Sequence, residues 1–167
     1  MTDTLAGIRG VLARELEAFA REIELFPDDD LVWRTVPGIT NSAGTLALHV
    51  CGNLQHYLGA VLGGTGYVRD REREFSQRSG TRVELAAGLR ATVEVVNRVV
   101  PSLSGELLAR EYPEAVGGAR PGTGLFLLHL CTHLAHHLGQ AGYLRRVLTG
   151  ANRSSGAISV KVLAETA

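Results

Sequence analysis

All six histidines of this chain lie in two stretches that are otherwise apolar and uncharged. His133 and His137 are four residues apart, so on a helix they differ by about 40° in direction and about 6 Å in height. Two imidazoles placed in this way can chelate one divalent metal ion. A third ligand must come from another helix, and His49 lies in the other histidine-rich stretch. The remaining histidines are His56, His129 and His136.

Burial favours a shared metal ion over separate hydrogen bonds at these histidines. Residues 45–62 contain no Lys, Arg, Asp or Glu, and a helix that is apolar nearly all round is buried. Each buried imidazole needs a polar partner, and one metal ion satisfies several imidazoles together. The alternative, in which the histidines make only interhelical hydrogen bonds, stays open.

The residues near these histidines exclude two known types of metal site. The H-E-x-x-H motif is absent, because Leu134 and Ala135 follow His133. Di-iron bundles need Glu-x-x-His motifs, and neither histidine-rich stretch contains a Glu. A divalent ion on neutral imidazoles keeps open positions for water or a thiolate. Imidazole suits Zn²⁺ or Ni²⁺, with Mn²⁺ and Fe²⁺ as further candidates.

Two amide side chains are candidates to orient the metal ligands through their second ring nitrogens. Asn53 lies one turn beyond His49. Gln140 lies three residues beyond His137. An ordinary interhelical hydrogen bond is the alternative role for each amide.

The elements that must position these residues are helices. Apolar residues recur at spacings of three and four near the N-terminus, either Asn41 or Ser42 is a good N-cap for the second helix and Thr81 for the third, and Gly150 suits a helix C-terminus. We expect an all-α fold, a four-helix bundle with long connections, in one domain over residues 1–167. The apolar end of the tail, which includes Ile158, could pack as a terminal strand or lie over an edge of the fold. The predicted helices are 4–26, 42–62, 81–100 and 123–148.

Composition excludes several classes of protein. Lys+Arg and Asp+Glu both number 17, so the basic excess typical of nucleic-acid-binding proteins is absent. No apolar run reaches the length of a membrane span, and the N-terminus does not resemble a secretory signal. We therefore expect a cytoplasmic protein without nucleic-acid or membrane partners. Cys51 and Cys131 fit a reducing compartment and are interpreted as small buried residues.

Three separated motifs resemble the DinB-like, YfiT-like superfamily, in the same order along the chain. Residues 41–53, NSAGTLALHVCGN, resemble its second helix, and 133–140, HLAHHLGQ, resemble its H-x-x-x-H-x-G-Q signature. Residues 69–75, RDREREF, are similar to an R-D-x-E-F stretch of one uncharacterised branch. The resemblance covers roughly residues 5–150. It implies a four-helix bundle, commonly homodimeric, with a divalent metal held by His49, His133 and His137.

The resemblance implies two kinds of activity on a small-molecule substrate. Some relatives are thiol S-transferases that use a low-molecular-weight thiol, and others are described as metal-dependent hydrolases. The metal would then activate a thiolate or a water. The alternative is a non-catalytic, dimeric helical protein that binds a metal or a small molecule. His56, His129 and His136 match no ligand position and receive no role.

The charged stretch at residues 69–75 has two interpretations. As a solvated loop or helix start, its ion pairs contribute little to stability. Alternatively, Arg69 or Arg71 holds an anionic substrate. The first interpretation is favoured, because charge runs usually face solvent.

Overall fold

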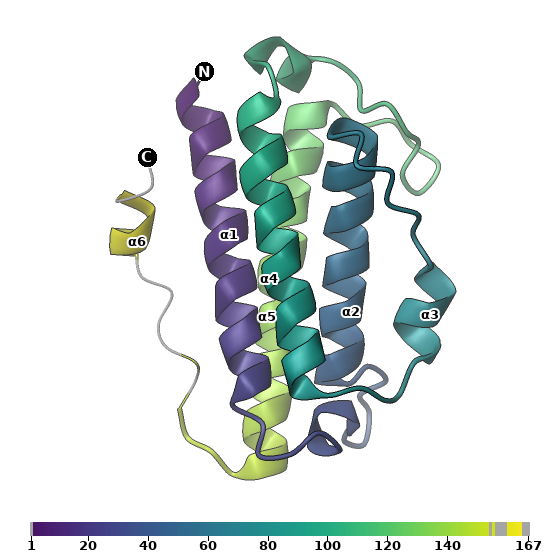
Figure 1. Ribbon diagram of the computed structural model, residues 1–167, viewed down its shortest axis with the longest axis vertical. Helices are drawn as coiled ribbons and strands as arrows, with labels where there is room; N and C mark the ends of the chain where they lie inside the picture. Colours follow the sequence, from purple (N-terminus) through teal and green to yellow (C-terminus); the bar gives the residue numbers. More distant parts are fainter. Residues whose placement is uncertain (1, 154, 156–159, 165–167) are drawn as a thin grey trace.

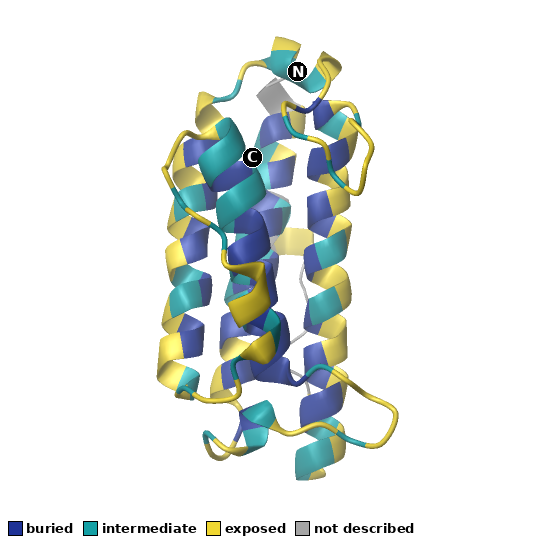
Figure 2. Cartoon of the chain, turned by 90° about the vertical axis from the view of Figure 1, so that its right-hand side faces the viewer, coloured by how far each residue is buried: buried dark blue, intermediate teal, exposed yellow. Residues whose placement is uncertain are grey.

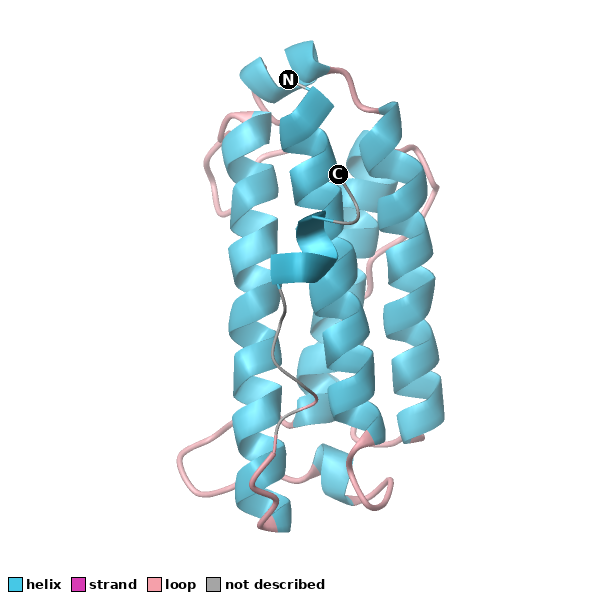
Figure 3. Cartoon of the chain, turned by 90° about the vertical axis from the view of Figure 1, so that its left-hand side faces the viewer, coloured by secondary structure: helices cyan, strands magenta, loops and turns pink. Residues whose placement is uncertain are grey.

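The computed structural model describes residues 2–153, 155 and 160–164, and their regular structure consists of helices without a strand (Figure 3). The expected all-α fold is confirmed. Helix α2 continues without a break into η2, a π-helical segment that ends at Leu62. The long elements are α1 (Thr2–Glu24), α2 (Ala43–Leu54) with η2 (Gln55–Leu62), α4 (Arg82–Val99) and α5 (Thr123–Thr149).

Shorter helices occupy the connections and the tail. Of the two arrangements considered for the tail, residues 160–164 do not form the strand, because they are helical, while Ile158 lies outside the described residues. None of the helices in the described part of the chain is long and apolar enough to cross a membrane. The short elements are η1 (Leu31–Trp33), α3 (Arg71–Ser76), η3 (Val100–Ser102), η4 (Gly105–Ala109) and α6 (Val160–Ala164).

Side-chain caps set the helix starts that the sequence indicates. The backbone N–H of Thr45 donates to Ser42 Oγ at 3.1 Å, which begins α2. Thr81 and Glu84 form a complete capping box at the start of α4. Gly150 adopts a φ of 70° after α5, a conformation that costs glycine little.

The long helices form a bundle in which α1 packs against α4 and α5, and α2 packs against the same two helices (Figure 1). α1 and α5 run in one direction, and α2 and α4 run in the other (Figure 1). Because α2 and α4 are parallel, residues 63–81 must return along the length of the bundle. This return carries α3 along the outer side of α2, where the two helices are in contact.

The core is built from the inward faces of all four long helices (Figure 2). Leu12, Leu16, Phe19 and Ile23 on α1 are fully buried, as the apolar spacing predicts. Tyr112, on the connection before α5, is also fully buried, and its hydroxyl donates to the Tyr57 carbonyl oxygen at 2.6 Å. Tyr112 also packs on Phe126 of α5, with ring centroids 4.5 Å apart, so it links η2 to the start of α5.

Candidate metal centre

Three histidine side chains converge between α2 and α5. His49 comes from the buried face of α2, and His133 and His137 come from successive turns of α5. His133 Nε2 lies 3.3 Å from His49 Nε2 and 3.1 Å from His137 Nε2. One nitrogen of each ring lies within 4.8 Å of the other two, an arrangement that could hold a metal ion. The fold thus brings together the predicted pair and the histidine of the other helix.

The spacing and charge of this cluster fit a divalent ion. A tetrahedral ion with metal–nitrogen bonds of about 2.0–2.1 Å separates its ligand nitrogens by about 3.3 Å, close to the two short distances here. Burial, reinforced by the positive charge that His137 and His49 would carry, lowers the pKa of His133 to about 3. Burial also lowers the pKa of His137. Uncharged imidazoles with available lone pairs are the form that binds metals.

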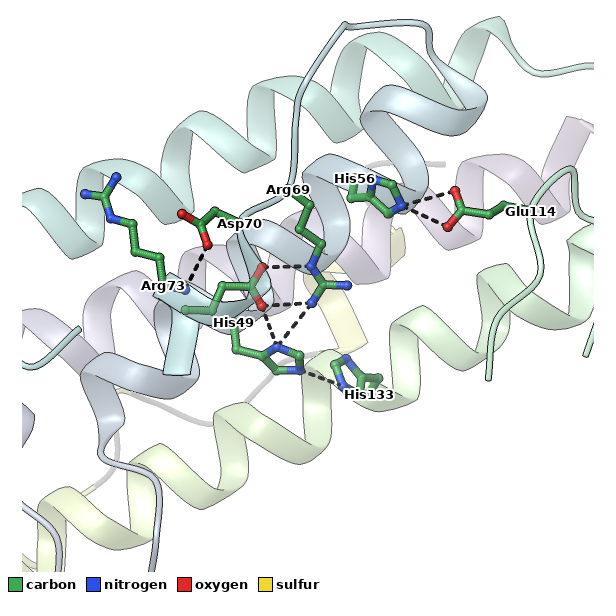
Figure 4. Close-up of polar contacts among 8 residues, drawn as sticks. His49, His56, Arg69, Asp70, Arg73, Glu114 and His133 are labelled. Carbon is green, nitrogen blue, oxygen red and sulfur yellow. Dashed lines mark hydrogen bonds and ion pairs between the residues drawn. The ribbon is translucent and has the colours of Figure 1, made fainter. Parts of the chain in front are cut away.

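A buried ion pair supports the His49 side of the cluster (Figure 4). Glu74 Oε2 lies 3.0 Å from His49 Nδ1. Arg69 donates from Nε to Glu74 Oε1 at 2.7 Å and from its terminal nitrogen to Oε2 at 2.8 Å. With Nδ1–H donating to the carboxylate, the Nε2 lone pair of His49 is directed at the cluster.

The sequence around Glu74 places this carboxylate. Asp70 caps the short helix α3 by accepting from the Arg73 backbone N–H at 2.9 Å. Gly52 on α2 makes room, because a Cβ there would lie 2.7 Å from Glu74 Cδ and closer still to Oε1. Burial by itself would raise the pKa of Glu74, but hydrogen bonds from Arg69 and His49 outweigh burial and lower it. The carboxylate therefore stays ionised beside His49.

An uncharged amide supports the other side of the cluster. Gln140 Oε1 lies 2.8 Å from His137 Nδ1, one turn along α5. The Gln140 side chain is exposed to solvent, in contrast to Glu74. A donated Nδ1–H would again direct the Nε2 lone pair of His137 at the cluster.

Asn53, the other amide expected to orient an imidazole, does not do so. Its side chain is buried, yet Oδ1 has no hydrogen-bond partner among the described residues. The distance along α2 fits, but the carboxylate of Glu74 already occupies His49 Nδ1. Glu74 thus takes the position that the sequence spacing suggested for Asn53.

The other histidines lie outside the cluster. His56 Nε2 lies 3.2 Å from a Glu114 carboxylate oxygen (Figure 4). His129 stacks on Phe126, with ring centroids 5.8 Å apart. His136 lies beside His137 but points into a groove on the surface.

Two functional candidates, Arg69 and Glu74, were not identified as metal-site residues from the sequence. The interpretation of residues 69–75 as a solvated charge run is wrong for this pair, whose side chains are only 10% and 6% exposed. The expectation that both cysteines are buried is confirmed for Cys131, whereas Cys51 is only partly buried. Burial raises the pKa of Cys51 to about 12 and that of Cys131 to about 11. The RDREREF motif was the feature of the sequence that could have identified these two residues. However, Glu74 is 25 residues from His49 along the chain, so no local pattern predicts that they meet.

Comparison with known proteins gives one result that bears on this site. The family model of the DinB superfamily matches residues 12–141, which include all three clustered histidines as well as Arg69 and Glu74. No curated protein sequence matches the chain. The match covers more than half of the chain and agrees with the helical bundle and its histidine cluster. The chain belongs to the DinB superfamily.

Proposed function

We propose that this protein is a metal-dependent enzyme, a thiol S-transferase or a hydrolase, with His49, His133 and His137 as the metal ligands. The observation that carries the proposal is the convergence of three imidazole nitrogens at the spacing of metal ligands. A bound divalent ion supplies open coordination positions at which a thiol or a water loses its proton near neutral pH.

Residues of the chain hold these ligands in place. Glu74 accepts the Nδ1–H of His49, and Arg69 keeps the carboxylate oriented through two hydrogen bonds. Gln140 does the same for His137 without a charge. Imidazoles bind a metal ion in their neutral form, so the centre would keep the full positive charge of the ion, which favours an anionic group such as a thiolate.

The test compares two histidines on one stripe of α5. His133→Ala removes the ligand that contacts both other imidazoles, and we expect loss of metal binding and of all turnover. His129→Ala, one turn earlier, is the control and should retain both. The assay panel covers transfer of a low-molecular-weight thiol to electrophiles and hydrolysis of esters. Turnover that survives His133→Ala unchanged would contradict the proposal.

A non-catalytic binding protein is the second candidate, and one observation favours it. The carboxylate that the fold brings to the cluster, Glu74, is already held by Arg69 and His49, so it is not available as a general base. Reproducible turnover of any substrate in the assay panel would refute this candidate. Under either function, we propose a cytoplasmic homodimer that acts on a small molecule, and sedimentation of the purified protein tests the dimer.

A further inference from the structure

A groove of about 830 Å³ lies beside the histidine cluster. One wall is the loop at residues 36–41, and the other is the C-terminal half of α5. Leu46 of α2 contributes to its base. Pockets for drug-sized molecules span about 300–1,000 Å³, so the groove is large enough for a substrate rather than a single ion.

The groove adjoins the metal centre along both helices. Leu46 precedes His49 by three residues, and Gln140 follows His137 by three residues. Since α2 and α5 are antiparallel, both steps lead toward the same end of the bundle, by about 4.5 Å each. Gln140 belongs to both places, because it lines the groove and its Oε1 lies 2.8 Å from His137 Nδ1.

The residues that line the groove favour an uncharged ligand over a charged one. Among the described residues that line it there is no Lys, Arg, Asp or Glu. Its surface is mainly apolar, and its hydrogen-bonding side chains are those of Thr40, Asn41, His136, Gln140 and Tyr143. By contrast, a second cavity of about 530 Å³ between α2, α3 and α4 is lined by Asp70, Arg73, Glu74 and Glu84 among others. An apolar wall without charges takes an uncharged molecule at the lowest desolvation cost.

We propose that this groove binds the uncharged alkyl or aryl body of the substrate and directs its reactive end toward the histidines. The inference rests on the proposed metal-dependent function, and it adds the substrate class: an apolar electrophile or ester, not a phosphorylated or polyanionic molecule. The groove contributes affinity through burial of apolar surface, and Asn41, His136 and Gln140 provide the polar contacts that fix orientation.

Gly139 offers a way to fill the groove without disturbing the fold. It lines the groove, and a Cβ built there meets nothing within 4 Å. Gly139→Leu therefore projects a side chain into the space that the substrate body would occupy. Gly7→Leu is a matched control, because Gly7 is also helical, exposed and without a neighbour within 4 Å, but lies on α1.

The experiment measures binding of two fluorescent dyes to Zn²⁺-loaded protein. One dye is uncharged anilinonaphthalene, and the other is its sulfonate, which carries the same rings and one negative charge. We expect the uncharged dye to bind more tightly than the sulfonate. Gly139→Leu should weaken its binding about tenfold or more, whereas Gly7→Leu should not change it. Zn²⁺ content should be the same in all three proteins.

Three outcomes would overturn the proposal: equal dye binding by the wild type and Gly139→Leu, equal loss in both glycine variants, or preference for the sulfonate. A change of sedimentation in Gly139→Leu with unchanged dye binding would instead identify the groove as an interface between two copies. Dye binding is measured by fluorescence and does not depend on turnover. Absence of Zn²⁺ from every sample would therefore contradict the proposed metal-dependent function, while dye binding would still test the proposed role of the groove.

Discussion

The two sides of the histidine cluster hold their imidazoles by different means. On the α2 side, His49 meets a buried carboxylate that is itself paired with Arg69, and both partners come from the connection that returns along the bundle. On the α5 side, His137 meets the exposed amide of Gln140, one turn away on its own helix. The first support depends on tertiary folding, whereas the second needs only a helix. Substitutions on the two sides should therefore differ in their effect on stability.

Glu74→Ala should have the largest effect. It leaves the buried Arg69 guanidinium and His49 Nδ1 without their partner, and breaking a buried pair in this way costs about 3 kcal/mol of unfolding free energy. Loss of a group that orients a metal ligand weakens metal binding by about 10–100-fold. Urea unfolding and Zn²⁺ titration measure the two effects.

The control for that change is Glu72→Ala on the exposed side of the same short helix. It should alter the unfolding free energy by no more than about 0.5 kcal/mol. If Glu74→Ala and Glu72→Ala behave alike in both measurements, the buried ion pair does not support the metal centre.

Gly52→Ala should have the next largest effect, because the new methyl group would meet the Glu74 carboxylate. We expect a loss of about 1–3 kcal/mol from overpacking, together with weaker Zn²⁺ binding as Glu74 leaves His49. Gly88→Ala on α4 is the matched control, since its Cβ meets only Cys51 Sγ at 3.8 Å, an ordinary contact. That variant should be neutral or more stable by about 0.5–1 kcal/mol. Equal thermal unfolding midpoints for the two variants would contradict the packing argument.

Substitutions of Gln140 should change metal affinity without changing stability. Gln140→Ala removes an exposed partner of His137, so the unfolding free energy should stay within about 0.5 kcal/mol while Zn²⁺ binding weakens by at most about tenfold. Gln140→Glu puts a carboxylate on His137 Nδ1, as Glu74 does on His49, and should tighten Zn²⁺ binding. Calorimetric titration of both variants checks the prediction, and weaker binding by Gln140→Glu would argue against it.

Asn53→Ala should have the smallest effect on the metal centre. Because Asn53 Oδ1 has no hydrogen-bond partner among the described residues, its removal should leave Zn²⁺ affinity within about twofold of the wild type. A loss as large as that of Glu74→Ala would show that Asn53 orients His49 after all. The same titration measures this difference.

Contacts within one helix could be predicted from the sequence. The four-residue spacing of His133 and His137 and the three-residue step to Gln140 follow from helical periodicity, and both are present in the structure. The helix starts at Ser42 and Thr81 follow in the same way from local capping.

Contacts between distant segments could not be predicted from the sequence in this way. Arg69 and Glu74 form part of a charge run, and only the return of residues 63–81 along α2 buries them against His49. No local pattern encodes that route, because it depends on the parallel packing of α2 and α4. The strand considered as one arrangement of the tail is absent at residues 160–164 for a related reason: alternating apolar residues favour a strand only where a sheet can accept them, and these residues are helical.

The most direct test of this account is the metal content of protein purified without a histidine tag and without added metal. Wild type is compared with His49→Ala, His137→Ala and His136→Ala, the last being a histidine of α5 outside the cluster. We predict about one divalent ion per chain in wild type and His136→Ala, and loss of the ion in the other two variants. Absence of metal from every sample, with no uptake of Zn²⁺, Ni²⁺ or Mn²⁺ on titration, would contradict the account.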